Sequence, residues 1–231
     1  MPGYIMHMAE ANLILKEIGS GKNDDWKRRF IAGNLLPDTK KKERKVTSHF
    51  WNPDTLEDMA IAPDLSRFLD KYEHVLDDPI VLGYYAHLYL DERFVHVYWK
   101  DMVDFYDDFG NRQYKKKDIT QALIKKTGQM IRRDLFFSGD YYYGDYSKLN
   151  HYFIEKYRID METDYADIVS CPIEEVDKQD LYQVLKELKW IMEYFHEGRE
   201  KEVRVFSKER LCAFLEDTAM EFIELIEGGR K

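Results

Sequence analysis

Cysteine, proline and glycine are scarce in this chain of 231 residues, which holds 2 Cys, 6 Pro and 12 Gly. The two cysteines, Cys171 and Cys212, cannot form a disulfide framework, so we expect a reducing compartment. Few helix breakers leave long uninterrupted segments, and a composition of 44% hydrophobic and 34% charged residues excludes a disordered chain. We therefore predict a helix-rich globular protein, long enough to bury a substantial core.

Positive charge is also in deficit, because 35 Lys and Arg face 44 Asp and Glu and give a net charge of −9. This balance argues against stable nucleic-acid binding, which needs a positive footprint. The longest apolar run, residues 80–90, is interrupted only by His87 and is well short of the roughly 20 residues that cross a bilayer. The first residues lack the basic and apolar regions of a signal peptide. We expect a soluble, cytoplasmic protein without a transmembrane segment.

Helical periodicity extends through most of the chain, and no alternating strand pattern, internal repeat or Pro- and Ser-rich linker interrupts it. The predicted helices cover about 8–18, 26–31, 64–72, 79–109, 118–137, 146–157, 173–196 and 207–227. Asp64 and Asp78 are predicted helix caps, and residues 33–63 are predicted to form a long irregular loop, of a length that is usually functional or disordered in a compact domain. The pattern predicts one all-α domain over 1–231, a helical bundle with the last two helices (within 173–231) as an appended pair.

Motifs of several common enzyme classes are absent. The segment 19–22 (GSGK) lacks the glycine spacing and the following Ser or Thr of a phosphate-binding loop. The chain also contains no Rossmann glycine pattern, no His-Glu-x-x-His, no Cys-x-x-Cys and no Gly-x-Ser-x-Gly. The chemistry is therefore sought among histidines and acidic residues.

His87 and Asp91 are four residues apart, so on a helix their side chains point within about 40° of each other. In an apolar helix both need partners, which a bound cation would supply. A His–Asp hydrogen bond that locks two helices together is the alternative. The spacing alone is not distinctive, because the sequence holds four such pairs: His74/Asp78, His87/Asp91, His151/Glu155 and His196/Glu200. We interpret the first and the last as surface pairs.

Four short segments add context to this pair: residues 2–7 (PGYIMH), 32–38 (AGNLLPD), 48–50 (SHF) and 83–91 (GYYAHLYLD). In their order and spacing they resemble the zinc-dependent phospholipase C family, whose helical fold is also similar to that of single-strand nucleases of fungi and plants. The resemblance covers roughly the first 100 residues and fades after Phe109. It implies a fold of the zinc-dependent phospholipase C type, with the metal site in the half 1–109.

The resemblance implies a centre of one to three zinc ions, or of another divalent metal. Its ligands to one ion would be Asp38, His49, His87 and Asp91. A neighbouring ion would take His7 and the bridging Asp91, and the candidates for a remaining site are His96, His151 and Glu155. On an unbroken helix, however, His96 lies about 180° from His87.

The activity implied by the resemblance is hydrolysis of a phosphoric ester, either a phospholipid or a soluble phosphoester, by a metal-activated water. Asp38 would orient or deprotonate that water. A basic run between Asp38 and His49 would draw the phosphate toward the metals, unless it is only a solvated loop. The candidate substrate-binding residues of this run are Lys40, Lys41, Lys42, Arg44 and Lys45.

The alternative function is a non-catalytic helical protein whose metal site is structural and which acts as an interaction module. The aromatic segment 136–146 would then form an interface, as it would form a substrate entrance in the enzyme. More often such rings pack under neighbouring helices, which is the arrangement we favour. The apolar stripes of the two C-terminal helices are typical of core packing or of a homodimer interface.

Overall fold

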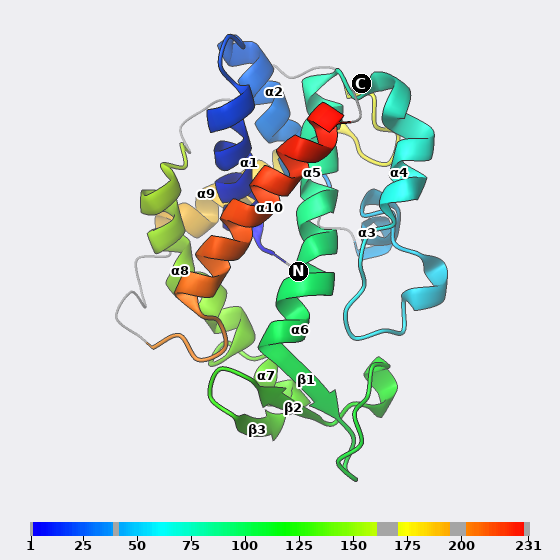
Figure 1. The fold of residues 1–231 in the computed structure, drawn as a ribbon, viewed down its shortest axis with the longest axis vertical. Helices are drawn as coiled ribbons and strands as arrows, with labels where there is room; N and C mark the ends of the chain where they lie inside the picture. The colour runs from blue at the N-terminus through cyan, green and yellow to red at the C-terminus, as the bar shows by residue number, and fades with distance from the viewer. Residues whose placement is uncertain (1, 39–41, 161–170, 195–201, 229–231) are drawn as a thin grey trace.

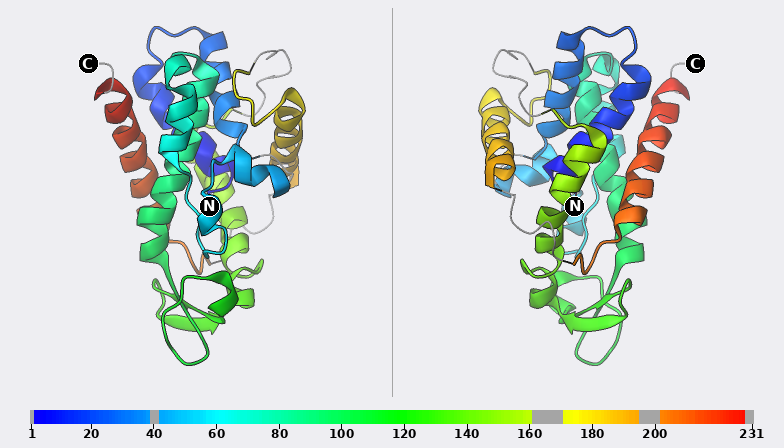
Figure 2. Two further views of the ribbon diagram at one scale, coloured as in Figure 1. Left: turned by 90° about the vertical axis from the view of Figure 1, so that its right-hand side faces the viewer. Right: turned by 90° about the vertical axis from the view of Figure 1, so that its left-hand side faces the viewer.

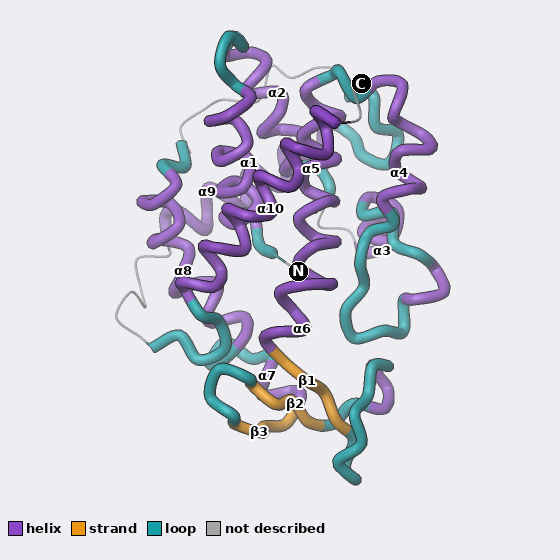
Figure 3. The backbone as a smooth tube through the Cα atoms, viewed as in Figure 1, coloured by secondary structure: helices purple, strands orange, loops and turns teal. Residues whose placement is uncertain are grey.

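A computed structural model of the chain describes residues 2–38, 42–160, 171–194 and 202–228. This part of the protein is mostly helical, with a small sheet at one end (Figures 1 and 3). The α-helices are α1 (Tyr4–Ile18), α2 (Asp24–Leu35), α3 (Lys42–Ser48), α4 (Leu65–Tyr72), α5 (Pro79–Arg93), α6 (Trp99–Met102), α7 (Arg133–Phe136), α8 (Tyr142–Tyr157), α9 (Lys178–Tyr194) and α10 (Lys208–Gly228).

Shorter elements connect the helices. The 3-10 turns are η1 (Pro53–Thr55), η2 (Glu73–Val75) and η4 (Lys116–Asp118), and a π-helical turn, η3 (Phe94–Tyr98), lies between α5 and α6. The strands β1 (Val103–Tyr106), β2 (Gln121–Ile124) and β3 (Gln129–Arg132) form an antiparallel sheet in the order β1-β2-β3. Most predicted helices are confirmed within a few residues, and the predicted loop 33–63 contains α3 and η1.

The sheet corrects the all-α prediction, because residues 103–109 and 118–132 were expected to be helical. Val103 and Phe105 of β1 are buried, whereas Asp104 and Tyr106 between and after them are partly exposed. The same alternation recurs in β2, and Gly128, with a φ of 70°, supplies the left-handed residue of the turn before β3. These two-residue periods are each only four residues long, so the surrounding helical pattern obscured them.

The crossing of α2 and α5 brings together two of the segments that carry predicted ligands. Asp78 caps α5 by accepting a hydrogen bond from the Ile80 amide at 2.8 Å, and it also pairs with Arg29 of α2. Two glycines remove the side chains at the crossing. A Cβ on Gly83 would lie 1.9 Å from the Phe30 carbonyl oxygen, and one on Gly33 would lie 2.0 Å from the Ile80 carbonyl oxygen. Only glycine therefore permits this close approach of the two backbones.

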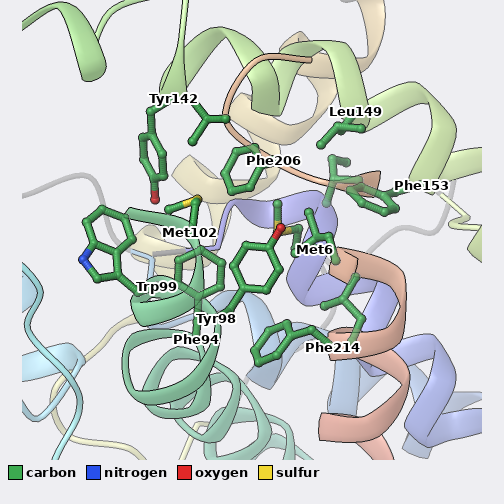
Figure 4. Close-up of a cluster of buried hydrophobic side chains, with 14 of the residues drawn as sticks. Met6, Phe94, Tyr98, Trp99, Met102, Tyr142, Leu149, Phe153, Phe206 and Phe214 are labelled. Atoms are coloured by element: carbon green, nitrogen blue, oxygen red, sulfur yellow. The ribbon is translucent and has the colours of Figure 1, made fainter. Parts of the chain in front are cut away.

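Two hydrophobic clusters flank the crossing. The first is rich in aromatic rings and joins the sheet, α6, α8 and the start of α10; Figure 4 shows part of it. Its labelled members are Met6, Phe94, Tyr98, Trp99, Met102, Tyr142, Leu149, Phe153, Phe206 and Phe214. The second cluster fills the space between α2, α4 and α5, where Phe68 stacks on the rings of Tyr84 and Tyr85. The α5 helix thus contributes to both clusters, which fixes its position along most of its length.

The last two helices lie on opposite sides of the molecule (Figure 2). The α10 helix packs against α1 and α5, whereas α9 lies on the far side and contacts α2. They are therefore not an appended pair. Among the helices of the described ranges, none is both long enough and apolar enough to cross a membrane.

Candidate metal centre

Five predicted ligands from four separate segments meet in the interior. His7 comes from α1, Asp38 follows α2, His49 follows α3, and His87 and Asp91 lie on α5. Each of the five is less than a tenth exposed. Buried polar groups that converge in this way need partners, because an unpaired buried charge is costly. The structure therefore brings together the full set that the resemblance implied for two neighbouring ions.

The Asp91 carboxylate lies at the middle of this set. Its Oδ1 is 3.5 Å from Nε2 of His7, whereas its Oδ2 is 3.6 Å from Nε2 of His49 and 3.7 Å from Nε2 of His87. Asp38 closes the other side, with Oδ1 3.5 Å from the same His49 nitrogen. Within the described residues, the donor atoms of His7, His87 and Asp91 lie within 4.8 Å of one another, as do those of Asp38, His49 and His87.

Hydrogen bonds to the far side of two rings orient these nitrogens. Nδ1 of His87 is 2.7 Å from the backbone carbonyl oxygen of Asn34, which can only accept, so His87 donates from Nδ1. The Ser48 hydroxyl donates to the Pro37 carbonyl oxygen at 2.8 Å, so its oxygen accepts from Nδ1 of His49 at 3.1 Å. The neutral form of each ring then presents a lone pair on Nε2, which is the arrangement found in metal-bound histidine.

The charges at the site follow from its burial. Burial and the neighbouring His7 lower the pKa of His87 to about 3, so this ring is neutral at pH 7. His7 stacks flat on it, with ring centroids 3.6 Å apart. Burial opposes the ionisation of Asp38, but Lys45 together with the neighbouring His49 and His87 outweighs it and holds the pKa of Asp38 well below its usual range. The pKa of Asp91 is lowered despite burial, by its histidine neighbours.

This donor set fits a divalent metal ion. The Nε2 atoms of His49 and His87 and both Asp91 oxygens are buried and have no hydrogen-bond partner among the described residues. Two lone pairs that face an ionised carboxylate at 3.6–3.7 Å repel it unless a cation lies between them. Imidazole nitrogens with carboxylate oxygens are a ligand set that suits zinc and its neighbours among the transition metals.

The backbone around His49 is shaped to aim its ring inward. Phe50, the next residue, has a φ of 51°, in the left-handed region that non-glycine residues rarely adopt. This turn ends α3, and the Trp51 amide donates to the Val46 carbonyl oxygen across it. Tyr84 of α5 also donates a hydrogen bond to the Ser48 carbonyl oxygen, which fastens the turn to the helix that carries His87 and Asp91.

Three further residues of the site were not among the predicted ligands. Asn34 and Ser48 act through His87 and His49, and a backbone carbonyl or a hydroxyl leaves no sequence pattern that would have identified them. Glu10 is fully buried, and burial together with the charge of Asp91 raises its pKa well above the usual range. Its position three residues after His7, on the same face of one helix, is a signal that could have been recognised.

The predicted third set does not come together. His96 lies in η3, half-exposed, and pairs with Glu92, while His151 pairs with Glu155 on α8. None of these residues belongs to a set of metal-ligand spacing within the described ranges. A π-helical turn does interrupt the α-helix at His96, yet the side chain is about half-exposed to solvent. His196 and Glu200 lie outside the described residues.

Lys45 is the member of the basic run whose side chain can be described. Its Nζ lies 3.0 Å from Oδ1 of Asp38, and its side chain is about one-third exposed. Lys40 and Lys41 lie outside the described residues. Lys42 and Arg44 belong to α3, but the structure describes only their backbone. The pair of Lys45 and Asp38 therefore forms the most accessible edge of the site that the structure shows.

A preformed groove starts near this site. The Trp51 ring lies 5.4 Å from the His49 ring and lines a groove of about 170 Å³ with Met59, Ala60 and Val95. Beyond Trp99 the same walls continue into a larger groove of about 300 Å³ beside β1. The aromatic segment 136–146 forms no part of these linings; Phe136 and Tyr142 are buried under neighbouring rings, as we favoured, and Tyr143 is exposed.

Comparisons of the chain with family models, with curated proteins and with solved structures found no match. The family resemblance therefore depends on the four short segments alone, and what it implies about activity remains a prediction.

Proposed function

We propose that the chain is a metal-dependent hydrolase of phosphoric esters, with zinc or another divalent transition metal held by Asp38, His49, His87 and Asp91. One observation carries the proposal. Buried, unpartnered imidazole nitrogens and carboxylate oxygens converge on Asp91, and a lysine ammonium stands beside them at the accessible edge. The first feature suits a cation, and the second suits an anionic substrate.

The composition of the donor set favours catalysis over a purely structural role. Structural zinc sites commonly use cysteine thiolates, yet neither donor set includes Cys171 or Cys212. Carboxylate and histidine ligands are typical of hydrolytic zinc sites, which keep a position open for water. The exposed edge formed by Asp38 and Lys45 gives such a position a route to solvent.

When bound, the metal would polarise the phosphoryl group and make water nucleophilic at neutral pH. The protein residues orient the ligands, bind the phosphoryl group and position the water. Asn34 and Ser48 hold the rings of His87 and His49 in the tautomer that presents Nε2. Lys45 binds a phosphoryl oxygen and keeps Asp38 ionised. Because its pKa is low, Asp38 is a weak proton acceptor and suits orienting a water better than deprotonating it.

The groove that begins at Trp51 supports an ester with an apolar organic group. Its lining of Met59, Ala60, Val95 and Trp99 is apolar, and Lys116 adds one charged side chain. This lining fits a phospholipid or a soluble ester with an aliphatic or aromatic portion, and both remain candidate substrates.

The second candidate function is an interaction module with a structural metal. Four protein ligands are enough to complete a tetrahedral ion, and α9 exposes the aromatic side chains of Tyr182 and Trp190, which are 66% and 55% exposed. Such rings are common in protein interfaces and in homodimers. This function predicts metal binding without turnover.

Hydrolysis assays on the full chain separate the two functions. Metal-stripped protein is reloaded with zinc or manganese and assayed on p-nitrophenyl phosphate, bis-p-nitrophenyl phosphate and a short-chain phosphatidylcholine. We expect hydrolysis that a chelator abolishes and added metal restores, with the least activity on the small monoester. Metal-replete protein that hydrolyses none of the three would contradict the proposed enzyme and leave the structural role.

A further inference from the structure

Glu10 is the buried ionisable residue that the proposed mechanism leaves unexplained. It lies on α1, one helical turn after His7, and its side chain is fully shielded from solvent. Both of its carboxyl oxygens lack a hydrogen-bond partner among the described residues. A buried carboxyl group in this state has either kept its proton or faces a cation.

The neighbours of Glu10 belong to the metal centre. The charge of Asp91 acts on Glu10, and the side chain of Asn34 lies against it. Asn34 is also buried and both polar atoms of its amide lack a hydrogen-bond partner, as do both ring nitrogens of His7. Glu10 therefore lies beside Asn34, and His7 precedes it by one turn on the same helix, on the α1 side of the site.

The two oxygens of Asp91 divide the centre into two sides. Oδ2 faces His49 and His87, and Asp38 completes the donors there. Oδ1 faces His7 alone. One imidazole ring and one shared carboxylate oxygen make a weak site for a divalent ion, because they supply less than two negative charges. Glu10 is the other buried, unpartnered carboxyl group on this side.

We propose that Glu10 belongs to the metal centre and, with His7 and Asp91, supplies the charge that holds a second divalent transition-metal ion on the α1 side. The inference depends on the metal of the proposed function but not on its reaction. Glu10 lies outside the donors grouped within 4.8 Å, so its contribution is stated as charge, with or without an intervening water. A divalent ion there would be matched by two carboxylates and one neutral ring.

Metal stoichiometry tests this assignment on the full chain. Wild type, Glu10→Gln and Glu17→Gln are stripped with chelator, dialysed against zinc or manganese, and measured by elemental mass spectrometry. Glutamine keeps the size of Glu10 and its position beside Asn34 but removes the charge. Glu17 is an exposed acid on the same helix and serves as the matched control. Thermal melts of the stripped proteins check that the fold is retained.

We expect two equivalents of metal in the wild type and in Glu17→Gln, and one in Glu10→Gln. His7→Ala should lose the same equivalent. Two tightly bound equivalents in Glu10→Gln, or a single equivalent in the wild type, would overturn the inference. The same measurements separate this inference from the proposed function. Two metal equivalents without phosphoester hydrolysis would support the role of Glu10 and contradict the proposed enzyme. Hydrolysis with a single equivalent would support the proposed enzyme and contradict the role of Glu10.

Discussion

The α5 helix and the π-helical turn that follows it carry two histidine–acid pairs of the same spacing but of opposite surroundings. His87 and Asp91 are buried, and their facing nitrogen and oxygens have no hydrogen-bond partner in the described part of the chain. Glu92 directly follows Asp91, and it forms an ion pair with His96 at the surface. The same i,i+4 geometry therefore forms a candidate metal centre in one place and a solvated ion pair in the other.

The two pairs differ in the number of other chain segments that pack against them. The turns after α2 and α3 and the buried face of α1 all converge on His87 and Asp91, held there by the glycine crossing of α2 and α5. His96 in η3 is instead half-exposed and pairs with Glu92 of the preceding helix. Exposed pairs of this kind contribute little to stability. Burying such a pair costs free energy of folding, so a buried pair is expected where it serves a function. Convergence rather than spacing therefore distinguishes a site from an ordinary pair.

The largest effect on metal affinity is expected from replacing the histidine of one pair but not that of the other. His87→Ala removes an Nε2 ligand and should lower metal affinity by well over the roughly 100-fold that loss of an outer hydrogen bond costs. His96→Ala should leave affinity unchanged, because His96 pairs only with Glu92. Competition with a chromogenic zinc chelator measures both. Equal affinities for the two variants would remove the distinction between the pairs.

A smaller effect should follow from releasing the His49 ring. Ser48→Ala deletes the hydroxyl that accepts from Nδ1 of His49, so the ring is free to adopt the other tautomer, and metal affinity should fall by about 10–100-fold. Ser66→Ala is the matched control, because that hydroxyl bonds only an exposed carboxylate, Asp64. The same chelator competition applies. An unchanged affinity in Ser48→Ala would mean that packing alone orients His49.

The smallest expected effect is on the stability of the metal-free protein as the pH falls from 7 to 5. The pKa of His87 drops from 6.5 to about 3 on folding, so over this range the unfolded chain binds a proton that the folded chain does not. The free energy of unfolding should fall by at most about 1.4 kcal/mol per pH unit from this residue.

Urea unfolding at pH 7 and pH 5 measures this dependence. His87→Gln should flatten it, and His96→Gln should not, because His96 is half-exposed in the folded state. Identical slopes in the two variants would show that His87 does not titrate on unfolding.

Much of this arrangement could be predicted from the sequence. The proline after Asp78 fixed the start of α5, and the ordered short motifs named the five residues that meet at the site. The sheet could not be predicted, because the alternation at Val103 and Phe105 is shorter than the helical pattern around it. The roles of Asn34 and Ser48 depend on contacts made only after folding. His96 was assigned to the third set by residue type and order alone, although helical spacing already placed it on the opposite side of the helix from His87.

Metal content per chain tests the central claim most directly. The wild-type protein is purified without chelator or nickel affinity and measured by elemental mass spectrometry, before and after incubation with zinc. The account predicts at least one equivalent of zinc or another transition metal, lost on dialysis against a strong chelator and regained on reloading. No bound metal, even after incubation with zinc, would show that His7, His49, His87 and the two aspartates form a buried polar network and not a metal centre.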